Sequence, residues 1–331
     1  MVTSAPPLDS ILLLAGDRKD QRLLAKALGA TGCLVEFAAS PEEAERCVKI
    51  KGPQLIVADY DPDPNETGWS LERYDKFLES IADIGDSPRR TRVLLLADKR
   101  QKEELGSLFR LPFLTNLIAK NHPLDLDELI ITTAKIINGD IFGIEKYLCY
   151  GVKPVTHIVR SSRDKTPLLE TLANYATGLG INKRLVTVAK SVADELIMNA
   201  IYNAPVREDG SRPYAHVART DAVDLASHET CRLTYACDGR QLVIAMLDRF
   251  GSLAVETIRE YLQRCFAMGA DQIEVKRGGA GMGLYFIVEA LNKVIINICP
   301  GRGTEVIGVI DISGSYRDYA EKNKSFHIFL A

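Results

Sequence analysis

The sequence lacks several features that define whole classes of proteins. No apolar run approaches the ~20 residues of a membrane-spanning helix, and the first ten residues lack the basic start and apolar core of a signal peptide. The seven cysteines include no C-x-x-C pair, and the five histidines show no zinc-binding spacing. A net charge of -3 provides no electrostatic basis for binding nucleic acid or an anionic membrane. We therefore expect a cytoplasmic protein that binds neither nucleic acid nor membrane.

The composition is that of an ordinary globular protein, with 46% hydrophobic and 26% charged residues. A chain of 331 residues favours two domains over one. Glycines and a proline concentrate in residues 140–153 and just beyond, where we place a linker. This divides the chain into a first domain at 1–139, a second at 154–313 and a C-terminal tail at 314–331. The tail ends in SFHIFLA, which could add a strand or dock on a partner.

The first domain alternates short apolar runs with helix-like stretches. Ser40 and Pro41 have the pattern of an N-cap and first helical residue, while Gly29 and Gly139 are predicted helix ends. Continuous apolar strands separated by helices predict a doubly wound parallel sheet of α/β class. The predicted strands are 10–15, 33–38, 54–59, 91–97 and 115–119.

Ligands of such a sheet bind beyond the carboxyl ends of its strands. Those ends carry Asp17, Asp59, Ala97 and Lys120. The arrangement resembles the receiver domain of bacterial response regulators, a flavodoxin-like fold. The resemblance implies that Asp59 is a phosphoacceptor and that Lys120 is the lysine of the fifth strand.

The sequence also departs from the receiver pattern at two strand ends. Ala15 and Gly16 stand where the family has its acidic pair, with Asp17 just beyond, and Ala97 replaces the hydroxyl residue. Fewer carboxylates should weaken Mg²⁺ binding, and with it phosphoryl transfer. Two interpretations remain: a degenerate receiver that acts as an interaction module, or phosphorylation of Asp59 assisted by Asp17 or Asp61.

The second half carries polar residues in a helical pattern, followed by glycine-rich segments. Glu195, Asn199 and Asn203 lie at i, i+4 and i+8 of an amphipathic helix, which places them on one side. Taken alone, this row could be a solvated face. An apolar strand at 241–247 leads into Asp248, and the glycine-rich stretch KRGGAGMGLYFI follows at 276–287.

This ordered set resembles the GHKL ATPase superfamily, which includes histidine kinases, DNA gyrase B subunits and anti-sigma-factor serine kinases. Its N-box appears as E-L-I-M-N-A from Glu195, its D-x-G box as Asp248 to Gly251 with Phe250 inserted, and its G-T pair as Gly303 and Thr304. The glycine lid appears as G-A-G-M-G-L at 279–284. The resemblance implies an α/β sandwich over about residues 152–313 that binds ATP with Mg²⁺.

The resemblance also implies a role for each residue type. Asn199 would ligate Mg²⁺, Asp248 would accept a hydrogen bond from the adenine amine, and Glu195 would be the general base. Backbone N–H groups of the lid would bind phosphate. The implied nucleotide-binding residues are Asn199, Asn203, Asp248, Gly251, Gly279, Gly281, Met282, Gly283, Leu284 and Thr304.

Other interpretations of the glycines fit less well. A dinucleotide fingerprint counted from Gly279 needs glycine at position 284, where Leu284 stands. No G-x-x-x-x-G-K-[ST] occurs, which argues against a P-loop. A glycine turn with a purely structural role stays open.

The residues around the N-box indicate which branch of the superfamily this sequence resembles. His157 lies in a strand-like context and His228 lies after the N-box, so both are predicted to be structural rather than phosphoacceptors. A strand and helix leading straight into the N-box are similar to the anti-sigma-factor serine kinases. Many of that branch carry histidine where Asn203 stands. The polar segment after the N-box, around 205–230, is predicted to be a loop with an edge hairpin.

Together these features predict an ATP-binding bacterial signal-transduction protein with a receiver-like domain coupled to a GHKL domain. It could be a protein serine kinase or weak ATPase whose partner is a sigma-factor antagonist or another signalling protein, and a homodimer is left open. The alternatives are a non-catalytic, nucleotide-dependent scaffold and an atypical histidine kinase. A stand-alone ATPase with a gyrase-like cycle fits less well, because the residues after 313 are too few for the transducer domain that it would need.

Overall fold

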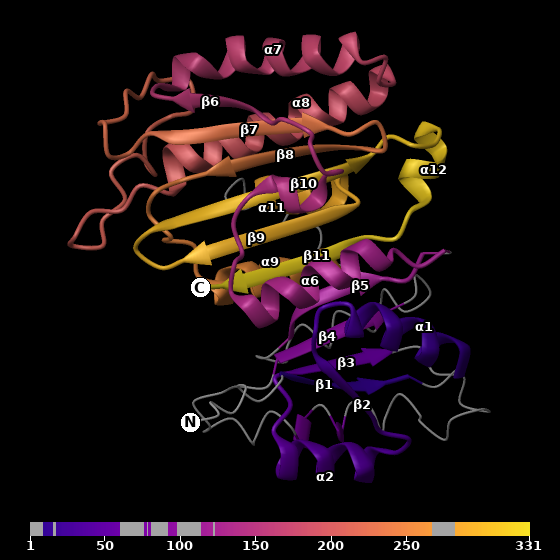
Figure 1. Ribbon diagram of the computed structural model, residues 1–331. Helices are drawn as coiled ribbons and strands as arrows, with labels where there is room; N and C mark the ends of the chain where they lie inside the picture. The colour runs from indigo at the N-terminus through magenta and orange to yellow at the C-terminus, as the bar shows by residue number, and fades with distance from the viewer. Residues whose placement is uncertain are drawn as a thin grey trace, which may run out of the picture. The chain divides into compact units, whose positions relative to one another are not determined.

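The computed structural model describes residues 9–15, 18–59, 76–77, 79–80, 92–97, 114–121, 123–266 and 282–331. The chain divides into two compact units, Met1–Asp140 and Ile141–Ala331, which are described separately (Figure 1). The division falls at the start of the interval predicted as a linker. None of the helices in the described ranges is long and apolar enough to cross a bilayer.

The first unit contains a parallel sheet in the order β2-β1-β3-β4-β5. This is the flavodoxin-like order of a doubly wound fold, as the sequence predicted. Residues of β3 are buried along its whole length, which explains why these strands read as continuous apolar runs. The strands are β1 (Ser10–Leu14), β2 (Leu34–Phe37), β3 (Leu55–Asp59), β4 (Arg92–Ala97) and β5 (Leu114–Ala119).

The helices described in this unit are α1 (Arg18–Gly29), α2 (Pro41–Lys51) and α6 (Leu126–Asn138). Ser40 caps α2 as predicted, because its side chain accepts a hydrogen bond from the Glu43 N–H at 3.2 Å. Gly139 ends α6 in the left-handed conformation, with φ 71°. α1 ends at Gly29, as predicted, and the left-handed residue of the turn that follows is Gly32, with φ 83°.

The second unit is built on a mixed sheet in the order β11-β9-β10-β8-β7-β6. Its pairs are antiparallel, except that β11 lies parallel to β9. The strands are β6 (Val155–Val159), β7 (Cys231–Cys237), β8 (Gln241–Leu247), β9 (Lys293–Cys299), β10 (Gly303–Asp311) and β11 (Ser325–Leu330). The last strand shows that the end of the predicted tail, Ser325–Leu330, is part of the sheet, which is one of the two roles expected for SFHIFLA.

The helices of this unit lie against the sheet, with α8 behind β7 and β8 in Figure 1. The apolar side of α8, including Leu185, Val192 and Leu196, is buried, and the helix contacts β8, β10, α7 and α11. The helices are η2 (Ile144–Tyr147), η3 (Ser162–Asp164), α7 (Lys165–Gly178), α8 (Lys183–Met198), η4 (Asn199–Asn203), α9 (Val255–Phe266), α11 (Met282–Ala290) and α12 (Tyr316–Glu321).

The polar segment between η4 and β7 differs from its prediction. Residues 205–230 form turns, and the only pairing that they make with strand geometry is an isolated bridge between Ser161 and Asp224. The expected edge hairpin is therefore wrong. Two backbone hydrogen bonds around this bridge, from Ser162 to Val223 and from Leu225 to Arg160, hold this segment against the rest of the unit together with hydrogen bonds from side chains.

Candidate functional site

The predicted N-box lies where α8 passes into a single π-helical turn, η4. Asn199 is the first residue of that turn and Asn203 the last, and the Asn203 Nδ2 donates to the Asn199 Oδ1 at 2.9 Å. The wider turn replaces the usual i to i+4 backbone bond, so the Ala204 N–H donates to the Asn199 carbonyl at 3.0 Å. Single π turns inside helices occur frequently at functional sites.

Glu195 lies one turn before Asn199, and its two carboxylate oxygens have different surroundings. The Oε1 accepts a hydrogen bond from Arg219 at 3.3 Å. The Oε2 is buried and has no hydrogen-bond partner among the residues that the structure describes. A buried acceptor without a partner costs about 1–3 kcal/mol or more when it is charged, so it marks a place where a donor is missing.

The start of α11 packs directly on this carboxylate. A Cβ placed on Gly283 would lie 2.2 Å from the Glu195 Oε2 and 3.5 Å from the Asn199 Nδ2. Only glycine therefore fits at position 283 without displacing Glu195. The glycine that the sequence assigned to a phosphate lid is thus brought against both N-box residues.

Asp248 follows β8 and is held by backbone N–H groups. Its Oδ1 accepts hydrogen bonds from Phe250 at 2.7 Å, from Gly251 at 3.2 Å and from Thr304 at 3.3 Å. Only 8% of the residue is exposed, and no N–H group of the described residues donates to its Oδ2. Burial raises the pKa of Asp248, although the hydrogen bonds from Phe250, Gly251 and Thr304 oppose that shift.

Thr304 is the second residue of β10, next to Asp248. The residue is 2% exposed, and its side chain lies beside the Asp248 carboxylate, where it lowers the pKa of Asp248; the hydroxyl has no other hydrogen-bond partner in the described part of the chain. Two adjacent buried groups, one carboxylate oxygen and one hydroxyl, are therefore available to a molecule that can donate and accept hydrogen bonds.

Glycines keep the two loops at Asp248 close together. Gly251 has φ 60°, and a Cβ there would lie 2.1 Å from the Cys299 carbonyl oxygen. A Cβ on Gly303 would lie 2.8 Å from the Asp248 carbonyl oxygen. Phe250 needs no such freedom, because none of the described non-glycine residues has positive φ. Gly251, predicted to bind the cofactor, thus has a structural role that accounts for its identity.

Two side-chain contacts join the Asp248 loop to the end of η4. The Ser252 Oγ donates to the Ala204 carbonyl at 2.8 Å. Arg212 donates to the Ser252 carbonyl at 3.3 Å and also to the carbonyl of Asn203. The end of η4 and the loop after Asp248, some fifty residues apart in sequence, are in this way held together.

Sequence reasoning missed Arg212 and Arg219, although the polar segment 205–230 contains both. Nothing in a single sequence indicates which arginine of a loop will meet a carboxylate elsewhere. Four predicted residues lie outside the described ranges: Asp17, Asp61, Gly279 and Gly281. Met282 and Leu284 lie in the first turn of α11. Their predicted roles in binding nucleotide stay predictions. His157 contacts the Tyr235 hydroxyl at 3.1 Å within the sheet, which agrees with a structural role.

In the first unit, Asp59 and Lys120 meet at the carboxyl end of the sheet. Asp59 is 3% exposed, and the Lys120 Nζ lies 3.0 Å from both of its carboxylate oxygens. The same ammonium lies 3.6 Å from Asp20, an acidic residue of α1 that the sequence did not single out. At the end of β1, the Ala15 carbonyl accepts a hydrogen bond from Gln21 at 2.6 Å.

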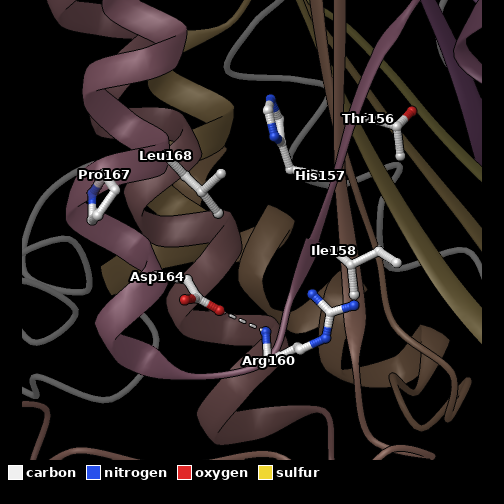
Figure 2. Close-up of a pocket in the computed structure, with 7 residues that line it drawn as sticks. All are labelled: Thr156, His157, Ile158, Arg160, Asp164, Pro167 and Leu168. Carbon is white, nitrogen blue, oxygen red and sulfur yellow. Dashed lines mark hydrogen bonds between the residues drawn. The ribbon is translucent and has the colours of Figure 1, made fainter.

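An open hollow of about 520 Å³ lies between β6 and the start of α7 (Figure 2). Among the residues that line this hollow, the Arg160 backbone N–H donates a hydrogen bond of 2.8 Å to the Asp164 carboxylate (Figure 2). The hollow contains none of the predicted site residues, so it does not correspond to the site at Glu195 and Asp248. Its lining residues are Thr156, His157, Ile158, Arg160, Asp164, Pro167 and Leu168.

Comparison with known proteins gives matches for structure only. No family model matches the sequence, and no curated protein does. A response regulator receiver protein from Pseudomonas putida is 20% identical, with 41% of this chain covering 100% of that one at a TM-score of 0.30. A response regulator from Thermotoga maritima is also 20% identical, with 40% of this chain covering 99% of that one at 0.30. A receiver domain protein from Clostridium thermocellum is 17% identical, with 40% of this chain covering 96% of that one at 0.31.

Proposed function

We propose that residues 141–331 bind ATP together with Mg²⁺ in the manner of the GHKL superfamily, and that the chain is a signal-transduction protein. The observation that carries this proposal is Asp248. Its carboxylate is buried, one oxygen is held by three backbone N–H groups, and no N–H group of the described residues donates to the other. The Thr304 hydroxyl lies beside this carboxylate and has no other hydrogen-bond partner among the described residues. A fixed, buried acceptor of this kind suits the exocyclic amine of adenine.

The phosphate end of the proposed site lies at the N-box. Mg²⁺ takes a few protein oxygens and completes its shell with water and substrate phosphates, so the Asn199 carboxamide oxygen is a sufficient protein ligand. In the structure that oxygen accepts from Asn203, which can instead donate to a phosphate. The bound cation would neutralise phosphate charge.

Glu195 fits the role of general base. Its Oε2 accepts no hydrogen bond from a described residue and lies against the first turn of α11, whose positive end attracts phosphate. The proton acceptor and the phosphate-binding backbone would thus be adjacent. This arrangement supports transfer of phosphate to a partner's hydroxyl, or to water. The competing role is a scaffold in which nucleotide only sets conformation, and the two differ in whether Glu195 is used.

Calorimetric titration of the full chain tests nucleotide binding. We expect ATP with Mg²⁺ to bind with micromolar affinity, about -8 kcal/mol, and to bind at least ~10-fold more weakly when the metal is chelated. GTP should bind at least ~10-fold more weakly than ATP, because guanine presents a carbonyl where adenine presents an amine donor to Asp248. Absence of ATP binding, or equal affinity for GTP, would contradict the proposal.

For the first unit we propose a role in protein interaction without phosphorylation. The Lys120 ammonium already occupies both Asp59 oxygens, and an alanine carbonyl paired with Gln21 stands where the family places metal-binding carboxylates. Incubation with acetyl phosphate and Mg²⁺ should therefore add no phosphate to the protein, as measured by intact mass. A phosphate that is incorporated by the native protein but not by Asp59→Asn would show that this unit is an active receiver.

A further inference from the structure

The segment 205–230, which we call the arginine loop, is anchored on both sides of Arg219. Before it, Arg212 donates to the carbonyls of Asn203 and Ser252. After it, the Asp221 carbonyl accepts from the Tyr202 hydroxyl at 2.8 Å, and the Val223 N–H donates to the Ser162 Oγ at 2.9 Å. These contacts fix the loop against the N-box, so the position of Arg219 is set by the fold.

Arg219 ends at the proposed general base. Its guanidinium lies 3.3 Å from the Glu195 Oε1, and 51% of the arginine side chain and 24% of the glutamate side chain are exposed. An ion pair this accessible contributes only about 0–1 kcal/mol, so a competing anion can replace it. A phosphate is such an anion, because guanidinium donates to two of its oxygens at once.

The location of Glu195 indicates which phosphate of ATP would replace it as the partner of Arg219. A general base must come within hydrogen-bond reach of the hydroxyl that attacks the terminal phosphorus. Asp248 marks the adenine end of the same site, and Glu195 marks the other. A guanidinium in contact with Glu195 is therefore next to the γ-phosphate and remote from the base of the nucleotide.

We propose that Arg219 exchanges Glu195 for the γ-phosphate when ATP binds, so that it senses the third phosphate and frees the base. This inference rests on the proposed function and names a residue of the arginine loop as part of the ATP site. In the reaction, the hydroxyl oxygen of water or of a partner serine bonds to the γ-phosphorus. The bond from that phosphorus to the β–γ bridging oxygen breaks, Glu195 accepts the hydroxyl proton, and ADP leaves.

The test compares ATP and ADP affinities of Arg219→Ala with those of Arg207→Ala, by calorimetry on the full chain. Arg207 belongs to the same loop, and its side chain makes no hydrogen bond or ion pair with the described residues. We expect Arg219→Ala to lower ATP affinity ~10- to 100-fold and ADP affinity less than ~3-fold, by analogy with charge-assisted hydrogen bonds. Arg219→Lys should fall between, and Arg207→Ala should match the native protein.

The outcomes separate this inference from the proposed function. If the native protein binds neither nucleotide, the proposed site itself is wrong. If the native protein binds both and Arg219→Ala leaves the ratio of ATP to ADP affinity unchanged, the γ-phosphate contact is wrong while the site stands. An equal loss for both nucleotides would show that Arg219 only supports the loop, and would also overturn the inference. Thermal unfolding of each variant confirms that it is folded.

Discussion

Asp248→Asn is expected to bind ATP and ADP at least ~100-fold more weakly than the native protein, yet to be at least as stable. The amide keeps an oxygen that can accept from Phe250, Gly251 and Thr304, so the loop stays in place. Its other atom becomes an NH₂ donor that faces the adenine amine. Losing a hydrogen bond to a charged acceptor and leaving two donors opposed costs about 3 kcal/mol or more.

The stability of this variant follows from the raised pKa of Asp248. The folded state binds the carboxyl proton more tightly than the unfolded state, so the native protein loses stability as pH rises from the ordinary carboxyl range through the folded pKa. Asparagine does not titrate. The melting temperature of Asp248→Asn relative to the native protein should therefore rise with pH across that window and keep its advantage at neutral pH.

Asp238→Asn is the matched control. The Asp238 side chain is buried and lies just before the start of β8, whereas Asp248 follows the end of that strand. Burial raises its pKa, but hydrogen bonds from Gln241, Arg240 and Cys149 together hold that pKa below the usual value. Its charge therefore stabilises the fold above the unfolded pKa, and this stability is lost as pH falls. We expect Asp238→Asn to melt lower and to bind nucleotide normally. Native-like ATP affinity in Asp248→Asn would show that Asp248 does not contact adenine.

Glu195→Gln is expected to reduce phosphate transfer or hydrolysis by ~10²- to 10⁴-fold while changing ATP affinity less than ~3-fold. Glutamine has nearly the same shape and can still accept from Arg219, and it fits beside Gly283, but it cannot take up a proton. The measurement is transfer from labelled ATP to protein in a cell extract, together with release of phosphate from ATP by the purified chain.

Asp194→Asn provides the control, because Asp194 is the neighbouring carboxylate of α8 and is paired with Lys165 at 2.9 Å. It should retain the activity of the native protein. Equal activity in native protein and Glu195→Gln would refute the role of Glu195 as base. A native protein that binds ATP but neither transfers nor hydrolyses phosphate would instead support the scaffold role.

The local elements of this protein could be predicted from sequence because they depend on nearby residues. Buried strands such as β3 and β4 are short apolar runs, and the Ser40 cap and Gly139 stop are readable where they occur. The turn after α1, whose helix ends at Gly29 as predicted, illustrates the limit. Two glycines, Gly29 and Gly32, lie close together, and which of them becomes left-handed depends on how the chain enters β2.

The contacts that complete the site were decided by tertiary structure. The sequence alone determined the alternating and mixed α/β architecture and the candidate residues Glu195, Asn199, Asp248 and Thr304, because residue type, spacing and order carry that information. It did not determine that Gly283 lies against Glu195, that Asp20 joins Lys120, or that Arg219 pairs with Glu195. These contacts join separate segments of the chain, so they depend on packing and loop path rather than on local propensity. The segment 205–230 shows this most clearly: its composition predicts a polar loop with an edge hairpin, whereas its fold has no hairpin and places an arginine at the proposed base.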